Sequence, residues 1–375
     1  MIRARGFSLV ELMVAITLAL IVTAGVISVF IGSRSAFEAT SGTAALTDSG
    51  RFALSFISNA VRSAGYMSCT TAPNIQSTLT PAGTALPFSF NQALGGFEAV
   101  GTGPGTGYAL APAPVASDAS TADWLANPSA AIAGLDAAIS TLATGAPVQN
   151  NDVLIVRSTL RNAQAVYVSA IVDGASSFTV NQAGSLSVAG GPQLAVISDC
   201  AKGVVFQING LGAPTPNVVV THNASGGAGG NSTASFPVSF APGSQVTPVD
   251  TVVYFIAPGA DTDGALWVAD LNATDVLPIT ATELVPDIEA MQILYGLDTN
   301  KTQNVQNYVT ADKVTDFNAV MSIKVALLAA SAPGSANPPA VANTYNLLGT
   351  TVTAPIDRRS RQVFEETIAV RNALP

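Results

Sequence analysis

The sequence predicts an α+β fold, in which one long N-terminal helix precedes a large antiparallel β-rich globular domain. An uncharged, apolar stretch runs from residue 12 to residue 33, directly after the charged start of the chain. No proline occurs before Pro73, so no residue before that point forces a break in a helix. From residue 152 onward, short runs rich in Val, Ile, Phe and Thr alternate with turn residues, a pattern typical of β-strands.

The composition argues against several functional classes. Of the 375 residues, 48% are hydrophobic and only 10% are charged, and the net charge is −9. Soluble enzymes usually carry far more charge than this. The 15 Lys and Arg residues are spread over the chain, which disfavours a basic nucleic-acid-binding face. We therefore expect no specific nucleic-acid partner.

The apolar stretch near the N-terminus predicts a membrane helix. It is longer than the minimum needed to span a bilayer, and Arg3 and Arg5 before it hold that end in the cytoplasm. A secretory signal would have a shorter apolar core followed by a small-residue cleavage site. Here Ala24-Gly25 is a weak candidate for such a site, and the helical pattern continues past it. The rest of the chain is expected on the far side of the membrane.

Glu11 is the informative residue of this segment. A carboxylate at the edge of a spanning helix is costly, and such a residue usually has a function. The sequence from Gly6 through Phe7 to Glu11 (GFSLVE) resembles the class III signal of type IV prepilins and pseudopilins. The resemblance implies that a prepilin peptidase and methylase cleaves between Gly6 and Phe7 and methylates the new amino group of Phe7.

The proposed cleavage gives Glu11 a physical role. In a filament, the new amine of Phe7 and the Glu11 carboxylate would both lie in an apolar helix bundle, where an unpaired charge is very costly. Pairing the two groups, within or between subunits, removes that cost and fixes the axial register of each subunit. The alternative is a glutamate that only extends to the lipid headgroups.

The chain is expected to divide into four parts. These are a leader at 1–6, a transmembrane half-helix at 7–33, an amphipathic half-helix at 34–65 and a β-rich globular domain at 66–375 with Pro/Gly-rich loops. Gly65 is the expected helix stop. The amphipathic half is expected to pack on the domain through one stripe of apolar side chains: Leu46, Phe52, Phe56, Ile57 and Val61.

Strand signals define the expected globular domain, which contains no internal repeat. The pair at 165–172 and 177–181 is expected to form a hairpin around Asp173-Gly174. A short helix is expected at 129–143. The other expected strands are 152–157, 203–209, 217–221, 251–257, 290–297, 319–328 and 362–370.

Several segments of this domain resemble the PilW family of minor pilins. They are Asp199-Cys200 with 204–206, Ala265-Leu266-Trp267, the run 284–298 and the tail 358–372. The resemblance implies a low-abundance subunit that starts pilus assembly and sits at the tip. Its partners would be other minor pilins, the major pilin and a large tip adhesin, with roles in adhesion or twitching motility. It would wait in the inner membrane of a Gram-negative bacterium before reaching the pilus tip.

Two other functional classes remain open at this stage. A J-type minor pseudopilin of type II secretion shares the N-terminal signature and the general architecture. An adhesin or DNA-uptake module on a pilin anchor is the second alternative, although low positive charge disfavours strong binding to phosphates.

Cys69 and Cys200 are the only cysteines. In an oxidising periplasm they can pair, and the family resemblance supports that pairing. The bridge would close a loop of about 130 residues and join the end of the helix to the β domain. Two buried free thiols are the alternative.

The residue types needed for catalysis are scarce. His222 is the only histidine, no nucleophile-elbow motif accompanies it, and its position before a Gly-rich loop predicts a solvated side chain. Zinc sites need more His and Cys than the chain contains. Arg358, Arg359 and Arg361 are interpreted as a solvated strand edge. We therefore expect a structural protein that is no enzyme and that needs no metal or cofactor.

Overall fold

The structure is a computed structural model. It describes residues 8–80, 88–114, 123–125, 147–170, 172, 174–189, 191–213, 217–227, 229–260, 263–271, 281–336 and 341–373. The leader residues and the expected helix at 129–143 lie outside these ranges. The architecture is a long helix followed by a strand-rich domain of several sheets, which confirms the α+β prediction.

Helix α1 spans Leu9–Ser63, close to the expected limits. Ser8 caps its N-terminus, and the chain leaves the helix through Gly65. Gly65 has φ +73°, and a Cβ there would lie 2.8 Å from the Cβ of Ala93, so both the backbone conformation and the space favour glycine. The predicted helix stop is confirmed.

Two sheets form the body of the domain. The larger has nine strands, with β13 (Gln245–Pro258) at its centre, and β13 pairs with four other strands. Its other members are β3 (Ile75–Ser77), β4 (Leu94–Phe97), β6 (Val153–Thr159), β7 (Val166–Tyr167), β9 (Gln193–Ser198), β10 (Gly203–Ile208), β14 (Gly264–Leu271) and β15 (Ala281–Pro286). The four-stranded sheet has the order β17 (Asn307–Val309), β16 (Ile288–Leu297), β18 (Val320–Ala330) and β21 (Arg361–Ala369), all antiparallel.

Smaller elements complete the described part of the domain. One hairpin, β1 (Tyr66–Met67) with β2 (Thr70–Thr71), follows α1 directly. Two three-stranded sheets contain β8 (Ser177–Val180), β11 (Gly210–Leu211) and β12 (Val218–Thr221), and β5 (Gly107–Ala109), β19 (Thr344–Leu347) and β20 (Thr350–Thr353). The 3-10 turns of the described residues are η1 (Ala72–Asn74), η5 (Ala311–Lys313), η6 (Phe317–Ala319) and η7 (Arg371–Ala373).

Most of the strands expected from sequence exist, within a few residues of their expected ends. The hairpin expected around Asp173-Gly174 forms in part: Val168 and Val180 make an antiparallel bridge, and the Ser169 N–H donates to the Thr179 carbonyl at 2.9 Å. The regular strands of the two segments also pair elsewhere, β7 with β13 and β8 with β12. Such short strands carry little signal in their own sequence, so the strands with which they pair depend on the tertiary packing around them. The sequence interpretation also missed β9, β14 and β15 as strands.

The domain has two principal cores. The larger lies between α1, the four-stranded sheet and one face of the nine-stranded sheet, and it includes Ile57, Val61, Leu327 and Ile368. The second core lies in what we call the distal lobe, defined as strands β7 to β12 with their loops. Its members include Val180, Phe206 and Val220, all fully buried.

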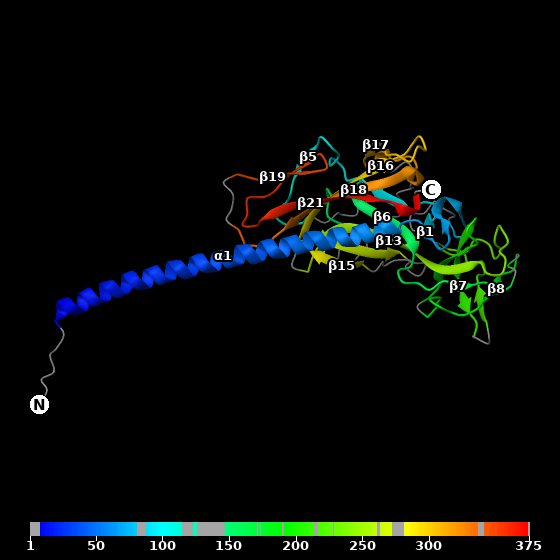
Figure 1. Cartoon of the computed structure of the whole chain (residues 1–375), viewed down its shortest axis with the longest axis horizontal. Helices are drawn as coiled ribbons and strands as arrows, with labels where there is room; N and C mark the ends of the chain where they lie inside the picture. Colours follow the sequence, from blue (N-terminus) through cyan, green and yellow to red (C-terminus); the bar gives the residue numbers. More distant parts are fainter. Residues whose placement is uncertain are drawn as a thin grey trace, which may run out of the picture.

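Figure 1 shows how these parts are arranged along α1. The first half of the helix projects from the domain, and the second half lies along one side of the domain. Burial along α1 begins at Gly42, whereas the large apolar side chains between Leu9 and Ile31 are exposed. This is the one described helix that is long and apolar enough to cross a membrane. The distal lobe, with β7 and β8, lies at the opposite end of the molecule from the N-terminus.

Candidate functional site: the assembly helix and its seat on the domain

The described chain begins with a capping box at Ser8 and Glu11. The Ser8 backbone N–H donates to Glu11 Oε2 at 3.1 Å, and the Glu11 N–H donates to Ser8 Oγ at 3.3 Å. This reciprocal pair satisfies two of the free N–H groups at the start of the helix. The carboxylate also interacts favourably with the positive end of the helix dipole. The negative charge of Glu11 is thus held at the very beginning of α1.

Gly6 and Phe7 lie outside the described residues, so the proposed cleavage point has no geometry to report. The contact with Ser8 still constrains the chemistry. The Glu11 carboxylate hydrogen-bonds the backbone nitrogen of the residue that directly follows Phe7. A new amine at Phe7 would therefore form next to the residue that this carboxylate already contacts. Pairing of the two groups stays a prediction.

The second half of α1 is seated on β18 and β21 at close range. A Cβ built at Gly50 would overlap the ring of Phe364, and one built at Gly42 would lie 2.7 Å from Ser335 Cβ. Glycine at these two positions lets the helix backbone approach the sheet more closely than any other residue allows. Gly50 and Phe364 together set the height of the helix above β21.

We expect Gly50→Leu to destabilise this seat by about 1 to 3 kcal/mol, because the added side chain overlaps the Phe364 ring and forces the ring or the helix to shift. The matched control is Gly32→Leu, since a Cβ at Gly32 has nothing within 4 Å. Urea unfolding of the detergent-purified full chain, followed by near-UV circular dichroism, measures the difference. Equal midpoints for the two variants would contradict the close approach at Phe364.

Polar contacts fasten the last turns of α1 to the end of the chain. Glu366 on β21 accepts hydrogen bonds from Ser58 Oγ at 3.0 Å and Arg62 Nη2 at 3.3 Å. The Asn372 side chain donates to the Ala64 carbonyl at 2.8 Å, which satisfies an oxygen at the helix C-terminus. The seat therefore combines apolar packing with polar side chains from β21 and the segment that follows it.

The expected apolar stripe is correct except at one position. Leu46, Ile57 and Val61 are buried and Phe56 is half-buried, but Phe52 is 62% exposed. Gly50 and Ala53 face the sheet instead. The sequence analysis missed this part of the buried face because it looked for large apolar side chains. Close helix contacts are made by small residues such as Gly and Ala.

Cys69 and Cys200 are joined by a disulfide, with 4.5 Å between their Cα atoms. Cys69 lies in the β1–β2 turn just after α1, and Cys200 lies in the turn between β9 and β10. Ser68 Oγ donates to the side chain of Gln245 on β13, so a second contact holds the same hairpin. The bridge thus connects the exit of α1 with the base of the distal lobe.

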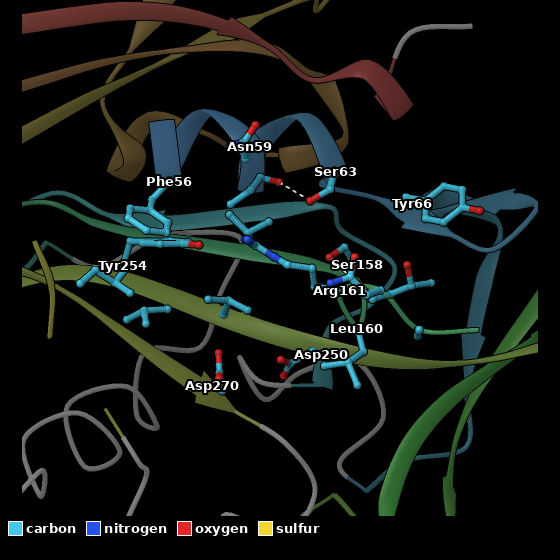
Figure 2. Close-up of a pocket in the computed structure, with 18 residues that line it drawn as sticks. Phe56, Asn59, Ser63, Tyr66, Ser158, Leu160, Arg161, Asp250, Tyr254 and Asp270 are labelled. Atoms are coloured by element: carbon cyan, nitrogen blue, oxygen red, sulfur yellow. Dashed lines mark hydrogen bonds between the residues drawn. The ribbon is translucent and has the colours of Figure 1, made fainter. Parts of the chain in front are cut away.

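A groove of about 650 Å³ runs along the last turns of α1 on the side away from β21. Figure 2 shows Phe56 reaching from the helix toward Tyr254 on β13, with Arg161 lying between the helix and the strands. Burial raises the pKa of Tyr254 to about 12, with Arg161 lowering it and Asp270 and Asp250 raising it. The charged side chains of the groove therefore gather around this phenol.

Comparison with known families gave two matches. Residues 1–27 match the prokaryotic N-terminal methylation motif, and residues 253–372 match the Type IV Pilus-assembly protein W family. The chain is a PilW-like type IV pilin. No curated protein and no solved structure matched the chain.

The two matched regions of this pilin lie apart on the molecule, because the described part of residues 1–27 belongs to the exposed half of α1 whereas the PilW match contains the sheet on which the second half is seated. The PilW match contains β14 to β21, and thus Phe364, Glu366 and Asn372, which hold α1. The distal lobe and the groove residue Arg161 lie outside both matches. The PilW match therefore coincides with the sheet on which α1 is seated.

The arginines near the C-terminus of the pilin correct the sequence interpretation. Arg359 and Arg361 were expected at a solvated edge, but their side chains are only 9% and 3% exposed. Arg361 contacts Glu289 at 2.6 Å and Asp357 at 2.6 Å, and Arg359 Nη1 contacts Asp263 at 3.1 Å. Glu289 and Asp263 are remote in sequence from these arginines, so charge spacing could not indicate their contacts, whereas the Asp357–Arg361 pair is local. Arg358 is exposed as expected.

A buried carboxyl pair in the pilin was missed altogether. Asp152 accepts hydrogen bonds from the backbone N–H groups of Ala99 at 3.0 Å and Ile293 at 2.7 Å, which joins the two main sheets. Burial raises the pKa of Asp152 to about 7 and that of its neighbour Glu98 to about 9, where Asp152 adds repulsion. Both side chains are buried. Among the described residues, no cluster of three or more His, Cys, Asp and Glu side chains could hold a metal.

His222 is also buried, and the expectation of a solvated histidine is wrong. It is 1% exposed and stacks on Phe236 with 4.2 Å between ring centroids and 4° between planes. Phe178 and Phe206 approach its ring from other directions. Burial lowers the pKa of His222 to about 4. The following Gly-rich loop suggested exposure, but the Val run before His222 carries it into the distal core.

We expect the stability of the pilin to fall as pH drops from about 6.5 to about 4, because the unfolded histidine binds a proton that the folded one resists. The loss amounts to about 2 kcal/mol after screening by solvent. Thermal unfolding of the wild type and of His222→Phe at pH 7 and pH 4.5 measures it. The expected result is a smaller acid-induced loss in His222→Phe, and equal losses would show that another group is responsible.

Proposed function

We propose that this PilW-like protein is a minor pilin that starts type IV pilus assembly and sits at the pilus tip with other minor pilins. The observation that carries the proposal is the division of the chain into a bare apolar helix and a large domain gathered at the far end of that helix. Cleavage before Phe7 and methylation of its amine would prepare the helix for assembly. Glu11 would then pair with that amine.

The size and shape of the domain support placement at the tip. A repeating shaft must stack identical domains closely, and the distal lobe extends beyond the end of α1 in the direction away from the membrane segment. At a tip, no further subunit has to occupy that direction. This argument rests on crowding, and it favours a low-abundance subunit over a repeating one.

The proposed route begins in the inner membrane. The apolar half of α1 would hold the precursor there with its N-terminus in the cytoplasm, because the first charges before the span are Arg3 and Arg5. The domain would lie in the periplasm, where the disulfide can form. We further propose that the protein is structural and catalyses no reaction.

Two measurements test the proposal. Mass spectrometry of the mature protein is expected to find an N-terminus at methylated Phe7, whereas an intact Met1 or an N-terminus beyond residue 20 would refute the processing step. An in-frame deletion is expected to remove surface pili and leave protein secretion intact. Normal pili with defective secretion would instead identify a J-type minor pseudopilin of type II secretion.

A further inference from the structure

Two exposed apolar side chains lie together at one end of the domain. Among the described residues after α1, Val341 and Ile356 are the most exposed large apolar residues, at 70% and 59%. The antiparallel ladder of β19 and β20 continues toward them, because the Ala354 N–H donates to the Asn343 carbonyl at 2.9 Å. The same register brings Val341 opposite Ile356, so the two side chains form a cross-strand pair. We call this part of the domain the arm: residues 341–343 and 354–358.

The arm lies at the end of the domain that faces the projecting half of α1. The Ala336 N–H donates to the Arg358 carbonyl at 3.1 Å. The loop that carries Ala336 also packs on α1, where Ser335 Cβ lies 2.7 Å from a Cβ built at Gly42, the first buried position along the helix. In Figure 1 the orange and red loops after β18 and after β20 form this end of the domain. The arm is therefore beside the point where α1 leaves the domain.

This end of the domain is also close to the membrane that holds α1. The uncharged run ends at residue 33, and Arg34 is the first charge after it. From Arg34 to Gly42 the helix rises about 12 Å. The headgroup layer on each side of a bilayer is about 5 to 8 Å thick, so the domain begins just beyond it. Phe37 lies in this interval and is 73% exposed, so an apolar surface continues from the span toward the arm.

The small area of the pair favours lipid over protein as its occupant. Two side chains expose far less than the about 800 Å² that each partner buries in a stable protein interface. Apolar contact with a bilayer has no such minimum and strengthens with the apolar area that is buried. Because α1 already anchors the chain, even a small contact can hold the domain against the bilayer.

Charge does not supply the attraction. Arg359 and Arg361 are in ion pairs with four carboxylates near the arm, Arg34 pairs with Glu38, and Arg358 is exposed. The four carboxylates belong to Asp263, Asp287, Glu289 and Asp357. Carboxylates thus outnumber arginines in this region, so negatively charged lipid should not strengthen the contact.

We propose that the arm inserts Val341 and Ile356 into the lipid surface of the membrane that anchors α1. The unassembled chain then lies with this end of its domain against the bilayer. The contact ends when α1 leaves the membrane for a filament. This inference rests on the membrane-anchored precursor of the proposed function, and it does not depend on a place in the pilus.

Fluorescence quenching tests the contact on the full-length chain in phosphatidylcholine nanodiscs. Tryptophan replaces Val341 or Ile356, and in the control it replaces Val219 on the distal lobe, which is 39% exposed. Lipid brominated on its acyl chains is expected to reduce the signal of the added tryptophan at least about twofold at positions 341 and 356, and to leave position 219 unchanged. The signal of the wild type, from Trp124 and Trp267, is subtracted in each case.

A charge variant tests the insertion itself. In the Ile356→Trp chain, Val341→Asp should lower the quenching to the level seen at position 219, because a carboxylate opposes entry into lipid. Val219→Asp is the matched control and should leave the quenching unchanged. Adding anionic phosphatidylglycerol to the discs should not increase it.

Four outcomes would overturn the lipid contact: no quenching at positions 341 and 356, equal quenching at position 219, no effect of Val341→Asp, or quenching that requires anionic lipid. A photo-crosslink from position 356 to another protein in the cell, with no quenching in discs, would assign the pair to a protein partner. The discs contain no other pilin. Quenching by a chain whose deletion leaves pili intact would therefore support the contact and reject only the pilus function.

Discussion

Replacing both Cys69 and Cys200 by alanine is expected to lower the free energy of unfolding by about 3 to 5 kcal/mol. The two residues are 131 positions apart, and opening a loop of that length restores much conformational freedom to the unfolded chain. The loss is a large fraction of the total stability of an ordinary domain. Urea unfolding of the full chain in detergent measures it.

The structure predicts where the unlinked chain loosens first. The bridge joins the β1–β2 hairpin to the turn before β10, so its loss frees the base of the distal lobe before the seat of α1. Hydrogen exchange should rise most around β9 and β10 and least in β18. The wild type treated with a reducing agent serves as control, and it should reproduce the double variant. Unchanged stability in both would mean that packing alone holds the hairpin.

The sequence predicted the elements whose residues signal their own structure. The uncharged run and Gly65 defined α1, apolar runs identified β6, β10, β16 and β18, and a mixed run with Val, Phe, Thr and Ile identified β21. The disulfide was expected from the family resemblance, with free thiols as the alternative. These features depend on local pattern or on a recognised motif, and neither requires knowledge of distant contacts.

Other features depend on contacts between residues far apart in sequence. In the seat of α1, Gly50 packs against Phe364, which lies near the other end of the chain. A single glycine within a helical sequence does not by itself indicate a close contact. Arg361 is buried in contact with Glu289, which lies 72 positions away in the chain. The groove exists because α1 covers one sheet and leaves part of another open. Such features follow from the assembled fold.

Glu11→Ala is expected to reduce the number of surface pili by at least about tenfold, with the domain folded and the protein level unchanged. In the assembled bundle the variant leaves the Phe7 amine without a carboxylate, and removing one partner of a buried charge pair costs about 3 to 5 kcal/mol. A cost of that size changes an assembly equilibrium by more than a factor of ten. Electron microscopy of sheared filaments provides the count.

The structure supplies a matched control on the same helix. Glu38 also lies on α1, where it pairs with Arg34 at 2.8 Å, and both side chains are well exposed. A surface pair of this kind contributes about 0 to 1 kcal/mol, so Glu38→Ala should leave pili at nearly normal numbers.

Loss of the Ser8–Glu11 capping box is a competing explanation for the Glu11 effect, and Glu11→Gln separates the two. Glutamine can still accept a hydrogen bond from the Ser8 N–H, so it retains the cap but cannot neutralise an amine. If pairing with the amine is the role of Glu11, Glu11→Gln should assemble as poorly as Glu11→Ala. Normal assembly by Glu11→Gln would instead reduce the role of Glu11 to starting the helix.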